Sequence, residues 1–480
     1  MTVRGAFRST QDITMATLLE IDPSTRTYRT LNPTTGELLR EYPPTTDDAA
    51  EALLGRAHAA FPGWRDTPVA RRAELLAKFA DLFEKNLDEL ARLVTIEMGK
   101  TTRDVKAEGG LVIDMFRYYA TNGERLLADE ITKAHGFSAL ITRREPLGVV
   151  LGIEPFNGPL YQSMRATCPN LMLGNTVLMK PSEISPGSTL RLDALFEEAG
   201  FPPHVYQTAL VSTAQVSSYI ADPRIRAITL TGSDRAGSAI GEQAGRHIKP
   251  VTLELGGSDA FIVLESADVS AAVATATVCR LLVTGQACVS PKRFILIEAI
   301  ADAFIAQVTK AFANQTLGDP LDPATTVGPM SSPAAADLLQ AQLQDALDKG
   351  VTVLVPGGRV DGPGAFFKPV VLTDITPNMR LYSEEAFGPI AMIYRVANTD
   401  AAVALANSSK YGLGGTVFGE DLVEARRVAG QLDTGGVGLN VFLGAPVEIP
   451  FGGTKASGTG RELGRSGMDQ FANIKTYAMR

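Results

Sequence analysis

The chain of 480 residues has few cysteines, few histidines and no long apolar run, and each shortage excludes a class of protein. Its three cysteines, Cys168, Cys279 and Cys288, form no CxxC pair, so neither a disulfide framework nor a thiolate zinc site is expected. The four histidines lack metal-ligand spacing, and we predict no metal site. No stretch approaches the roughly 18 apolar residues of a membrane span, and the opening segment lacks the apolar core of a secretion signal. These absences predict a soluble, cytoplasmic protein with a loose, polar N-terminal arm at residues 1–17.

Basic residues are also scarce, with 45 Lys and Arg against 53 Asp and Glu, for a formal charge of -8. Binders of nucleic acid or anionic membranes carry a basic excess or patch, so neither class is expected. The apolar fraction of 45% and the charged fraction of 20% are typical of globular proteins. At roughly 150 residues per domain, the length predicts two or three domains.

What the chain does contain is an alternation of helical and strand-like runs. Residues 47–119 are predicted to be helical, because their apolar residues recur at three- and four-residue spacing. In residues 148–257, and again in 259–433, short β-rich runs alternate with helical runs, which is typical of a parallel sheet covered by helices. Two such α/β units predict a ligand-binding cleft between them. Residues 129–144, with Gly136 at a turn, and the run NIKTYAM are predicted to be extended and to add an edge strand to a neighbouring subunit.

Cys288 lies in the run TGQACVSP, at the break between a helical run and the next strand. The glycine before it and the proline after it favour a non-repetitive backbone, from which a thiol can face a cleft. The alternative is a buried small hydrophobe, the usual state of a free cysteine. That alternative is expected for Cys168 and Cys279, because both lie in apolar helical runs.

Two further polar residues interrupt apolar or turn-forming segments. Glu254 ends the run VTLEL, and a carboxylate there is either paired or placed at the mouth of a site, where a raised pKa is useful. Asn157 lies in the rigid turn EPFNGP, where its amide either donates to an oxyanion or simply forms the turn.

Two segments are candidates for holding a nucleotide. In LTGSDRAG a strand ends at Gly232 and a helix begins at Ser233, so free backbone N–H groups can bind a phosphate, although helix capping explains the same residues. Lys180 and Glu183, in KPSE after a strand, either bind ribose hydroxyls or form an ordinary loop pair. The run MGKT at residues 98–101 lacks the first glycine of a phosphate-binding loop and is rejected.

Together these motifs resemble the aldehyde dehydrogenase superfamily from about residue 31 to residue 477. Eight motifs occur in the family's order: EPFNGP, KPSE, LTGSDRAG, LELGG, GQAC, EEAFGP, PFGGTK and NIKTY. The resemblance implies an α/β fold with two Rossmann-like domains and a small β element for forming a homodimer or homotetramer. The implied boundaries are 18–128 and 145–255 for the NAD(P)-binding domain, 256–450 for the catalytic domain, and 129–144 and 469–480 for the oligomerisation strands.

The resemblance also implies NAD(P)-dependent oxidation of an aldehyde to a carboxylic acid. Cys288 would attack the aldehyde as a thiolate, with the oxyanion held by the Asn157 amide and the Cys288 N–H. Hydride transfer leaves a thioester, and Glu254 would activate the water that hydrolyses it. The residues implied to contact the cofactor are Lys180, Glu183, Gly232, Ser233, Gly256, Glu385 and Phe387. Because a carboxylate at Glu183 accepts a ribose hydroxyl yet repels a 2′-phosphate, the sequence favours NAD over NADP.

Arg165 bears on the substrate, since it lies eight residues after Asn157, a little over two helical turns away and close to the same face. In this the chain resembles the succinic semialdehyde dehydrogenases, in which an arginine binds the distal carboxylate; the alternative is an arginine paired with a structural acid. Leu282 and the loop at residues 442–446 replace polar residues of those relatives, so apolar or aromatic aldehydes are a second interpretation. Glu254 disfavours a coenzyme A-acylating enzyme, and a non-catalytic NAD-binding protein is the remote alternative.

Overall fold

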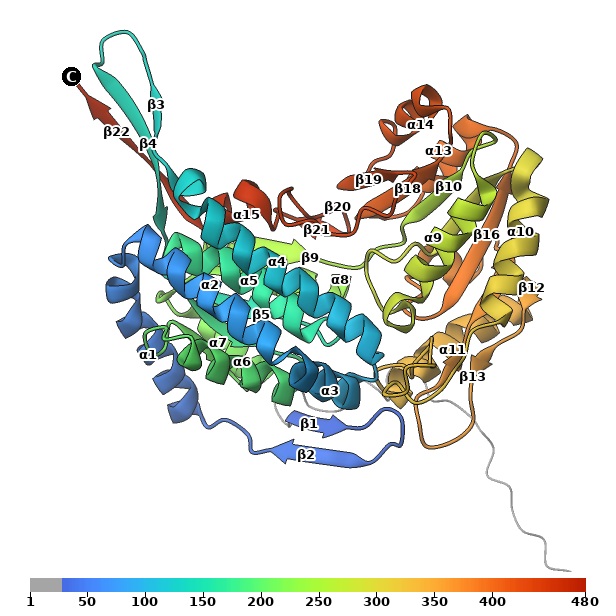
Figure 1. Ribbon diagram of the computed structural model, residues 1–480, viewed down its shortest axis with the longest axis horizontal. Coiled ribbons are helices and arrows are strands. Elements are labelled where there is room, and N and C mark those ends of the chain that lie inside the picture. The colour runs from blue at the N-terminus through green and yellow to red at the C-terminus, as the bar shows by residue number, and fades with distance from the viewer. Residues whose placement is uncertain (1–27) are drawn as a thin grey trace, which may run out of the picture.

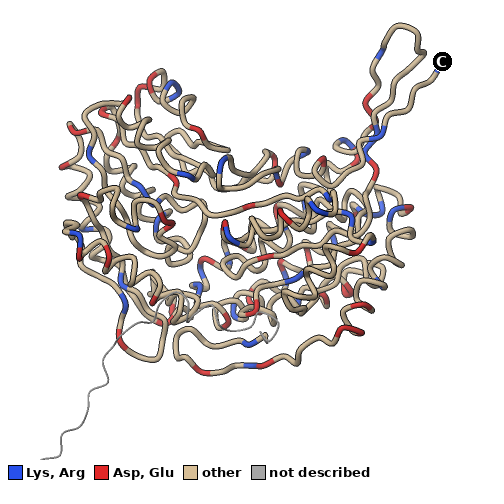
Figure 2. Tube along the Cα trace, turned by 180° about the vertical axis from the view of Figure 1, so that it is seen from behind, with Lys and Arg blue, Asp and Glu red and all other residues tan. Residues whose placement is uncertain are grey.

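The computed structural model describes residues 28–480, so the predicted arm at residues 1–17 lies outside the described residues. Two α/β parts lie on opposite sides of the molecule, and a narrow antiparallel sheet projects from one of them (Figure 1). Acidic and basic residues are interspersed along both parts (Figure 2). None of the helices in the described range is long and apolar enough to cross a membrane.

The first α/β part, here called the six-stranded part, is built on a sheet of order β21-β9-β8-β5-β6-β7. Its five strands from β9 to β7 are parallel, and β21 joins β9 antiparallel. The strands are β5 (Val149–Ile153), β6 (Thr176–Lys180), β7 (Tyr206–Thr208), β8 (Ile225–Thr231), β9 (Val251–Glu254) and β21 (Gly458–Thr459). Because helices cover both faces, β6 is buried at every position, which explains why its three central residues, Val177, Leu178 and Met179, are all apolar.

The helices of the six-stranded part come mainly from the first half of the chain. They are α1 (Asp47–Arg65), α2 (Val69–Lys85), α3 (Leu87–Met98), α4 (Thr102–Leu127), α5 (Pro159–Leu173), α6 (Pro186–Glu198), α7 (Thr213–Ala221) and α8 (Asp234–Arg246), with α15 (Gly464–Asp469) near the C-terminus. Phe79 of α2 stacks on Phe116 of α4 and Phe196 of α6, at ring-centroid distances of 4.3 and 4.2 Å. These rings join three helices through one buried aromatic cluster. A hairpin of β1 (Tyr28–Leu31) and β2 (Leu38–Tyr42) lies along this part.

The second part, here called the seven-stranded part, has a sheet of order β12-β15-β16-β11-β10-β18-β19, parallel except for β12. Its strands are β10 (Ala260–Val263), β11 (Arg293–Ile297), β12 (Thr352–Val355), β15 (Val370–Thr373), β16 (Ile390–Val396), β18 (Gly414–Phe418) and β19 (Gly436–Leu439). Its helices are α9 (Val269–Leu281), α10 (Glu298–Ala313), α11 (Pro333–Asp348), α12 (Arg380–Ser383), α13 (Thr399–Asn407) and α14 (Leu422–Ala429). The α/β class predicted from the alternating runs is confirmed.

Smaller antiparallel pairs complete the fold. They are β13 (Gly358–Arg359) with β14 (Phe367–Lys368), and β17 (Tyr411–Gly412) with β20 (Thr454–Lys455). The projecting sheet has the order β22-β4-β3 and consists of β3 (Glu130–Thr132), β4 (Ala139–Pro146) and β22 (Ala472–Met479). The predicted hairpin is thus present, with Gly136 at a φ of 85° in its turn, and the NIKTYAM run pairs with β4 of its own chain.

The short helix η2 (Leu282–Gly285) precedes Cys288 and carries three consecutive residues with left-handed backbone: Val283, Thr284 and Gly285, at φ of 53°, 55° and 75°. β-branched residues rarely adopt this conformation, so the surrounding packing must impose it. Asp104 accepts the Val283 N–H at 3.2 Å, and the Thr284 hydroxyl donates to the Gly328 carbonyl at 3.1 Å. The loop that carries Cys288 is therefore fixed by contacts on both sides.

Gly285→Ala is expected to lower the free energy of unfolding by about 2 kcal/mol or more, because an added Cβ would lie 2.4 Å from the Gly388 carbonyl carbon at a positive φ. Chemical denaturation measures the change. Gly110→Ala in α4 is the matched control: a Cβ there meets nothing within 4 Å, and a neutral or slightly stabilising effect is expected. Equal effects of the two substitutions would contradict the claim that the η2 loop is sterically fixed.

Candidate active site

A cavity of about 260 Å³ is lined by residues of both α/β parts. The six-stranded part contributes the turn after β5, one residue of α5 and the segments after β8 and β9, and the seven-stranded part contributes Cys288 and the segment after α12. Seven of the predicted site residues line it together: Asn157, Gly232, Ser233, Gly256, Cys288, Glu385 and Phe387. The cleft predicted between two α/β units is therefore present.

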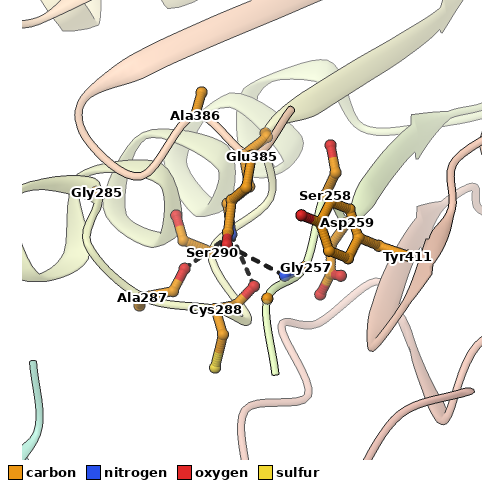
Figure 3. A network of polar contacts seen from close by, with 12 residues as sticks. Gly257, Ser258, Asp259, Gly285, Ala287, Cys288, Ser290, Glu385, Ala386 and Tyr411 are labelled. Atoms are coloured by element: carbon orange, nitrogen blue, oxygen red, sulfur yellow. Dashed lines mark hydrogen bonds and ion pairs between the residues drawn. The ribbon is translucent and has the colours of Figure 1, made fainter. Parts of the chain in front are cut away.

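Lys292 fixes the backbone at Cys288. Its fully buried ammonium donates to the carbonyl oxygens of Ala287 and Cys288, at 2.8 and 2.7 Å, and forms an ion pair with Glu385 at 3.0 Å. Figure 3 shows the Cys288 carbonyl oxygen turned into this polar network and the sulfur pointing away from it. The network thus holds the main chain while leaving the thiol clear of its hydrogen bonds.

Arg280 at the end of α9 holds the other side of the same loop. Its buried guanidinium donates to the Ile390 carbonyl at 2.9 Å and to the Ser290 hydroxyl at 2.6 Å. Neither Arg280 nor Lys292 was predicted from the sequence. The sequence does contain one signal for Lys292, which lies four residues after Cys288 and directly before an apolar strand. A cation in such a position is buried only when it is paired, so a partner for it could have been expected.

Burial raises the pKa of the Cys288 thiol to about 11, although the charges of Lys292 and Arg165 act in the opposite direction. At neutral pH the Cys288 thiol is therefore protonated. Burial also raises the pKa of Cys279, to about 12, and that of Cys168. The two latter cysteines are buried in the structure and lie outside the cavity, as expected.

The rate constant for alkylation of Cys288 by iodoacetamide is expected to rise about tenfold per pH unit from about pH 7 to pH 9.5, because only the thiolate reacts. Peptide mass spectrometry distinguishes Cys288 from Cys168 and Cys279, which serve as internal controls and should react more slowly. A rate that levels off near pH 8.5, as for a solvent-exposed thiol, would show that burial does not control the thiol.

Asn157 lies in the turn between β5 and α5, next to the Cys288 loop. One N–H of its amide donates to the Gln286 carbonyl at 2.8 Å, which leaves the second N–H for another acceptor. The turn is supported by Glu108, which accepts the N–H groups of Leu160 and Tyr161 at 2.9 and 2.7 Å, at the first turn of α5. Lys100, from the rejected MGKT motif, pairs with Glu108 at 2.7 Å and has a structural role.

Glu254 ends β9 directly behind Leu255 and Gly256, which line the cavity. Only 2% of the residue is exposed, and neither carboxylate oxygen has a hydrogen-bond partner among the described residues. Burial, and next the charge of Glu462, raise the pKa of Glu254 well above its usual range. A buried carboxyl group with a high proton affinity beside a reactive thiol is suited to proton transfer.

Arg165 lies in a buried cluster of charges behind the cavity. Its guanidinium forms an ion pair with Glu462, donates to the Thr231 hydroxyl at 3.0 Å, and lies over the rings of Tyr161 and Phe451 at 5.5 and 4.8 Å. It does not line the cavity of Cys288, but it lowers the pKa of that thiol. The substrate-binding role of Arg165 therefore stays a prediction, and the paired-acid alternative describes its observed contacts.

Glu154 is the third carboxylate of this cluster, which comprises Glu154, Glu254, Glu462 and Arg165. It is buried at the end of β5, and burial raises its pKa well above the usual range, with Glu462 adding to the effect. Three buried carboxyl groups lie around one guanidinium, so the single positive charge cannot balance all three carboxylates. Neither Glu154 nor Glu462 was predicted from the sequence, because their proximity arises only in the folded chain.

The remaining predicted cofactor residues divide into two groups. Ser233 caps α8 by accepting the Ala236 N–H at 3.2 Å, and with Gly232 it faces the cavity. Lys180 and Glu183, at the end of β6, form an ion pair at 2.6 Å outside the cavity. Among residues 28–480, no three His, Cys, Asp or Glu side chains are grouped to hold a metal ion.

Comparisons with known proteins agree on one family. The model described as "Aldehyde dehydrogenase family" matches residues 21–477. The chain is 47% identical over 451 residues to "Succinate-semialdehyde dehydrogenase [NADP(+)]" of Deinococcus radiodurans, with 94% of each chain covered. It is also similar to the succinic semialdehyde dehydrogenase of Streptococcus pyogenes in complex with NADP+, at 36% identity and a TM-score of 0.92 over 94% of this chain and 99% of that one. A salicylaldehyde dehydrogenase of Pseudomonas putida G7 complexed with salicylaldehyde has 33% identity and a TM-score of 0.91, with 95% of each chain covered.

These relatives overturn the prediction that NAD is the favoured cofactor. The Deinococcus radiodurans relative is named for NADP(+), and the Streptococcus pyogenes structure contains NADP+. The physical reason lies in the ion pair at the end of β6, because the Lys180 ammonium balances the charge of Glu183. The prediction of NAD was wrong, because it took the charge of Glu183 alone and left out the neighbouring charge of Lys180.

Proposed function

The chain belongs to the aldehyde dehydrogenase family, and from this premise we propose that it oxidises succinic semialdehyde to succinate with NADP. The observation that carries the proposal is the placement of the Cys288 thiol and the Asn157 amide in one cavity, with the Glu254 carboxyl group directly behind it. A nucleophile, an oxyanion donor and a proton acceptor thus lie together.

In the proposed mechanism Cys288 releases its proton to solvent water and attacks the aldehyde carbon as a thiolate, and the Asn157 amide stabilises the oxyanion of the thiohemiacetal. NADP, when bound, supplies the hydride acceptor. Glu254 then accepts a proton from the water that attacks the Cys288 thioester, which releases the acid and regenerates the thiol. Its raised proton affinity suits it to hold that proton until product leaves.

The residues of this chain fit a dinucleotide that carries a pyrophosphate and a ribose 2′-phosphate. The α8 N-terminus at Gly232 and Ser233 offers backbone N–H groups at the cavity, and Lys180 supplies a cation at the end of β6, two strands away from β8 in the sheet. We assign the cofactor to the predicted set Lys180, Glu183, Gly232, Ser233, Gly256, Glu385 and Phe387. Phe387 packs edge-on against Phe156 at 6.3 Å, so one wall of the cavity is aromatic.

The distal carboxylate distinguishes succinic semialdehyde from the other candidate substrates. Arg165 provides a buried positive charge within electrostatic reach of Cys288. A second candidate substrate class, aromatic aldehydes, is favoured by the largely apolar loop at residues 442–446, which lines a neighbouring cavity, and by the similarity to a salicylaldehyde dehydrogenase.

The test compares kcat/KM, with NADP, for succinic semialdehyde, butyraldehyde and salicylaldehyde. A charge-assisted contact of about 1.5–3 kcal/mol predicts a preference of about 10- to 200-fold for succinic semialdehyde over butyraldehyde, which has the same chain length without the carboxylate. Equal rates would refute the semialdehyde assignment, and a preference for salicylaldehyde would move it to aromatic aldehydes.

We also propose that the protein forms a homodimer or homotetramer through the projecting β22-β4-β3 sheet. The outer edge of β22 pairs with no other strand among residues 28–480, and Ile474 and Met479 are about half exposed on it. Such an edge is suited to pairing with a second copy. Sedimentation of a fully active monomer would refute this oligomeric state.

We propose that the protein works in a reducing compartment such as the cytoplasm, because its three cysteines are free.

A further inference from the structure

The peptide bond between Ala287 and Cys288 is held from one side only. The Lys292 ammonium donates to the Ala287 carbonyl oxygen at 2.8 Å, and the Ser290 N–H donates to the same oxygen at 3.1 Å. None of the peptide bonds in the described chain is cis, so the N–H of Cys288 points in the opposite direction to the Ala287 carbonyl, away from Lys292. Lys292 therefore fixes the direction of this N–H through one rigid peptide plane.

The Cys288 N–H donates to no acceptor in the part of the chain that the structure describes. The Cys288 sulfur also points away from the polar network of Lys292 (Figure 3). Asn157, which lines the same cavity, keeps one amide N–H available. Backbone N–H groups are normally hydrogen-bonded, so an unpaired one beside a reactive thiol is available to the oxygen of a bound aldehyde.

The group that holds this peptide bond carries a full positive charge away from solvent. Lys292 is completely buried, and its ammonium also donates to the Cys288 carbonyl oxygen at 2.7 Å and pairs with Glu385 at 3.0 Å. A hydrogen bond from a charged donor is stronger than one between neutral groups, and linked hydrogen bonds polarise one another where the dielectric constant is low. The ammonium on the Ala287 carbonyl thus makes the Cys288 N–H a stronger donor.

We propose that Lys292 is a positioning residue that aims the Cys288 N–H at the oxygen of the bound aldehyde and polarises it. When the thiolate adds to the carbonyl carbon, the C–S bond forms and the π electron pair of the C=O bond moves to the oxygen, where this N–H stabilises the new charge. Lys292 acts through the peptide bond and does not touch the substrate. The inference rests on the proposed function, but it applies to any aldehyde that Cys288 attacks.

The experiment compares two second-order rate constants in wild type, Lys292→Met and Lys292→Gln, at one pH and with saturating NADP. The first is that of the first turnover with succinic semialdehyde, measured by stopped-flow formation of NADPH. The second is that of Cys288 alkylation by iodoacetamide, which requires the thiolate but builds no oxyanion, because the thiolate displaces iodide. Alkylation should slow in Lys292→Met, because the Lys292 charge favours the thiolate. The first turnover should slow by about 10- to 100-fold more than alkylation.

Lys292→Gln keeps an N–H donor without the charge, so the ratio of its two rate constants should fall less than that of Lys292→Met. It also provides the test if the methionine variant does not fold. Arg293→Met is the matched control, because Arg293 is the next residue and is also buried. Its guanidinium donates to the carbonyl oxygens of Ser258 and Leu405, outside the Cys288 loop. The ratio of the two rate constants in Arg293→Met should equal that of wild type.

An equal slowing of the two reactions in both Lys292 variants would overturn the inference, because Lys292 would then act on the thiol alone. A change confined to the affinity for NADP would also overturn it, by assigning Lys292 to the support of Glu385. The same fall of the ratio in Arg293→Met would overturn it as well, since the loss of any buried cation would then be sufficient. A wild-type protein that forms no NADPH with any aldehyde would instead refute the proposed function, and the inference with it.

Discussion

Cys288→Ala is expected to abolish aldehyde oxidation, with less than about 1% of the wild-type rate remaining, because no other thiol lines the cavity among the described residues. NADP affinity should change by less than about threefold, since the backbone contacts of Lys292 do not involve the sulfur. Formation of NADPH measures the rate, and fluorescence titration measures the affinity.

Cys279→Ala provides the control for this substitution. Cys279 is a buried, free cysteine of α9 outside the cavity, so its loss should leave turnover intact. Residual oxidation above a few per cent in Cys288→Ala would exclude Cys288 as the nucleophile. Loss of NADP binding would show that the substitution disturbed the fold and not the chemistry alone.

Glu254→Gln is expected to preserve a rapid first turnover and to slow the steady state by about 10²- to 10⁴-fold. The amide retains the volume of the carboxyl group but accepts no proton from water, so the thioester on Cys288 should accumulate. Stopped-flow absorbance should record a burst of about one NADPH per active site, followed by a slow phase. Absence of the burst would assign Glu254 to a step before hydride transfer.

The pH dependence of the steady state provides a second measure of Glu254. Because burial and Glu462 raise its pKa, the base form appears only above the usual carboxyl range, so the wild-type rate should rise with pH well above pH 4.5. Glu254→Gln should remove this rise of the steady-state rate with pH. Glu124→Gln, at an exposed position of α4, should retain it.

The fold and the centre of the site were predictable from sequence because each rests on local patterns. The three consecutive apolar residues at the centre of β6 reflect a strand buried on both faces, and Gly136 marks a turn that requires positive φ. Cys288 and Asn157 were identified from short turns that both face the cavity. Their roles in catalysis remain predictions until they are tested by substitution.

The charged surroundings of the site were not predictable, because they join residues that are distant along the chain. Glu462 meets Arg165 only when the C-terminal segment folds against α5, and Lys292 meets Glu385 only when the neighbouring strands β11 and β16 pair. The cofactor prediction failed for a related reason. The effect of Glu183 on a 2′-phosphate depends on its ion pair with Lys180, and the geometry of that pair is known only from the structure.

The most direct test of the account is the mass of the Glu254→Gln protein after mixing with NADP and succinic semialdehyde. The account predicts a covalent succinyl group on the peptide that contains Cys288, formed together with one NADPH per subunit. An unmodified protein despite NADPH formation, or a succinyl group on Cys168 or Cys279, would contradict it.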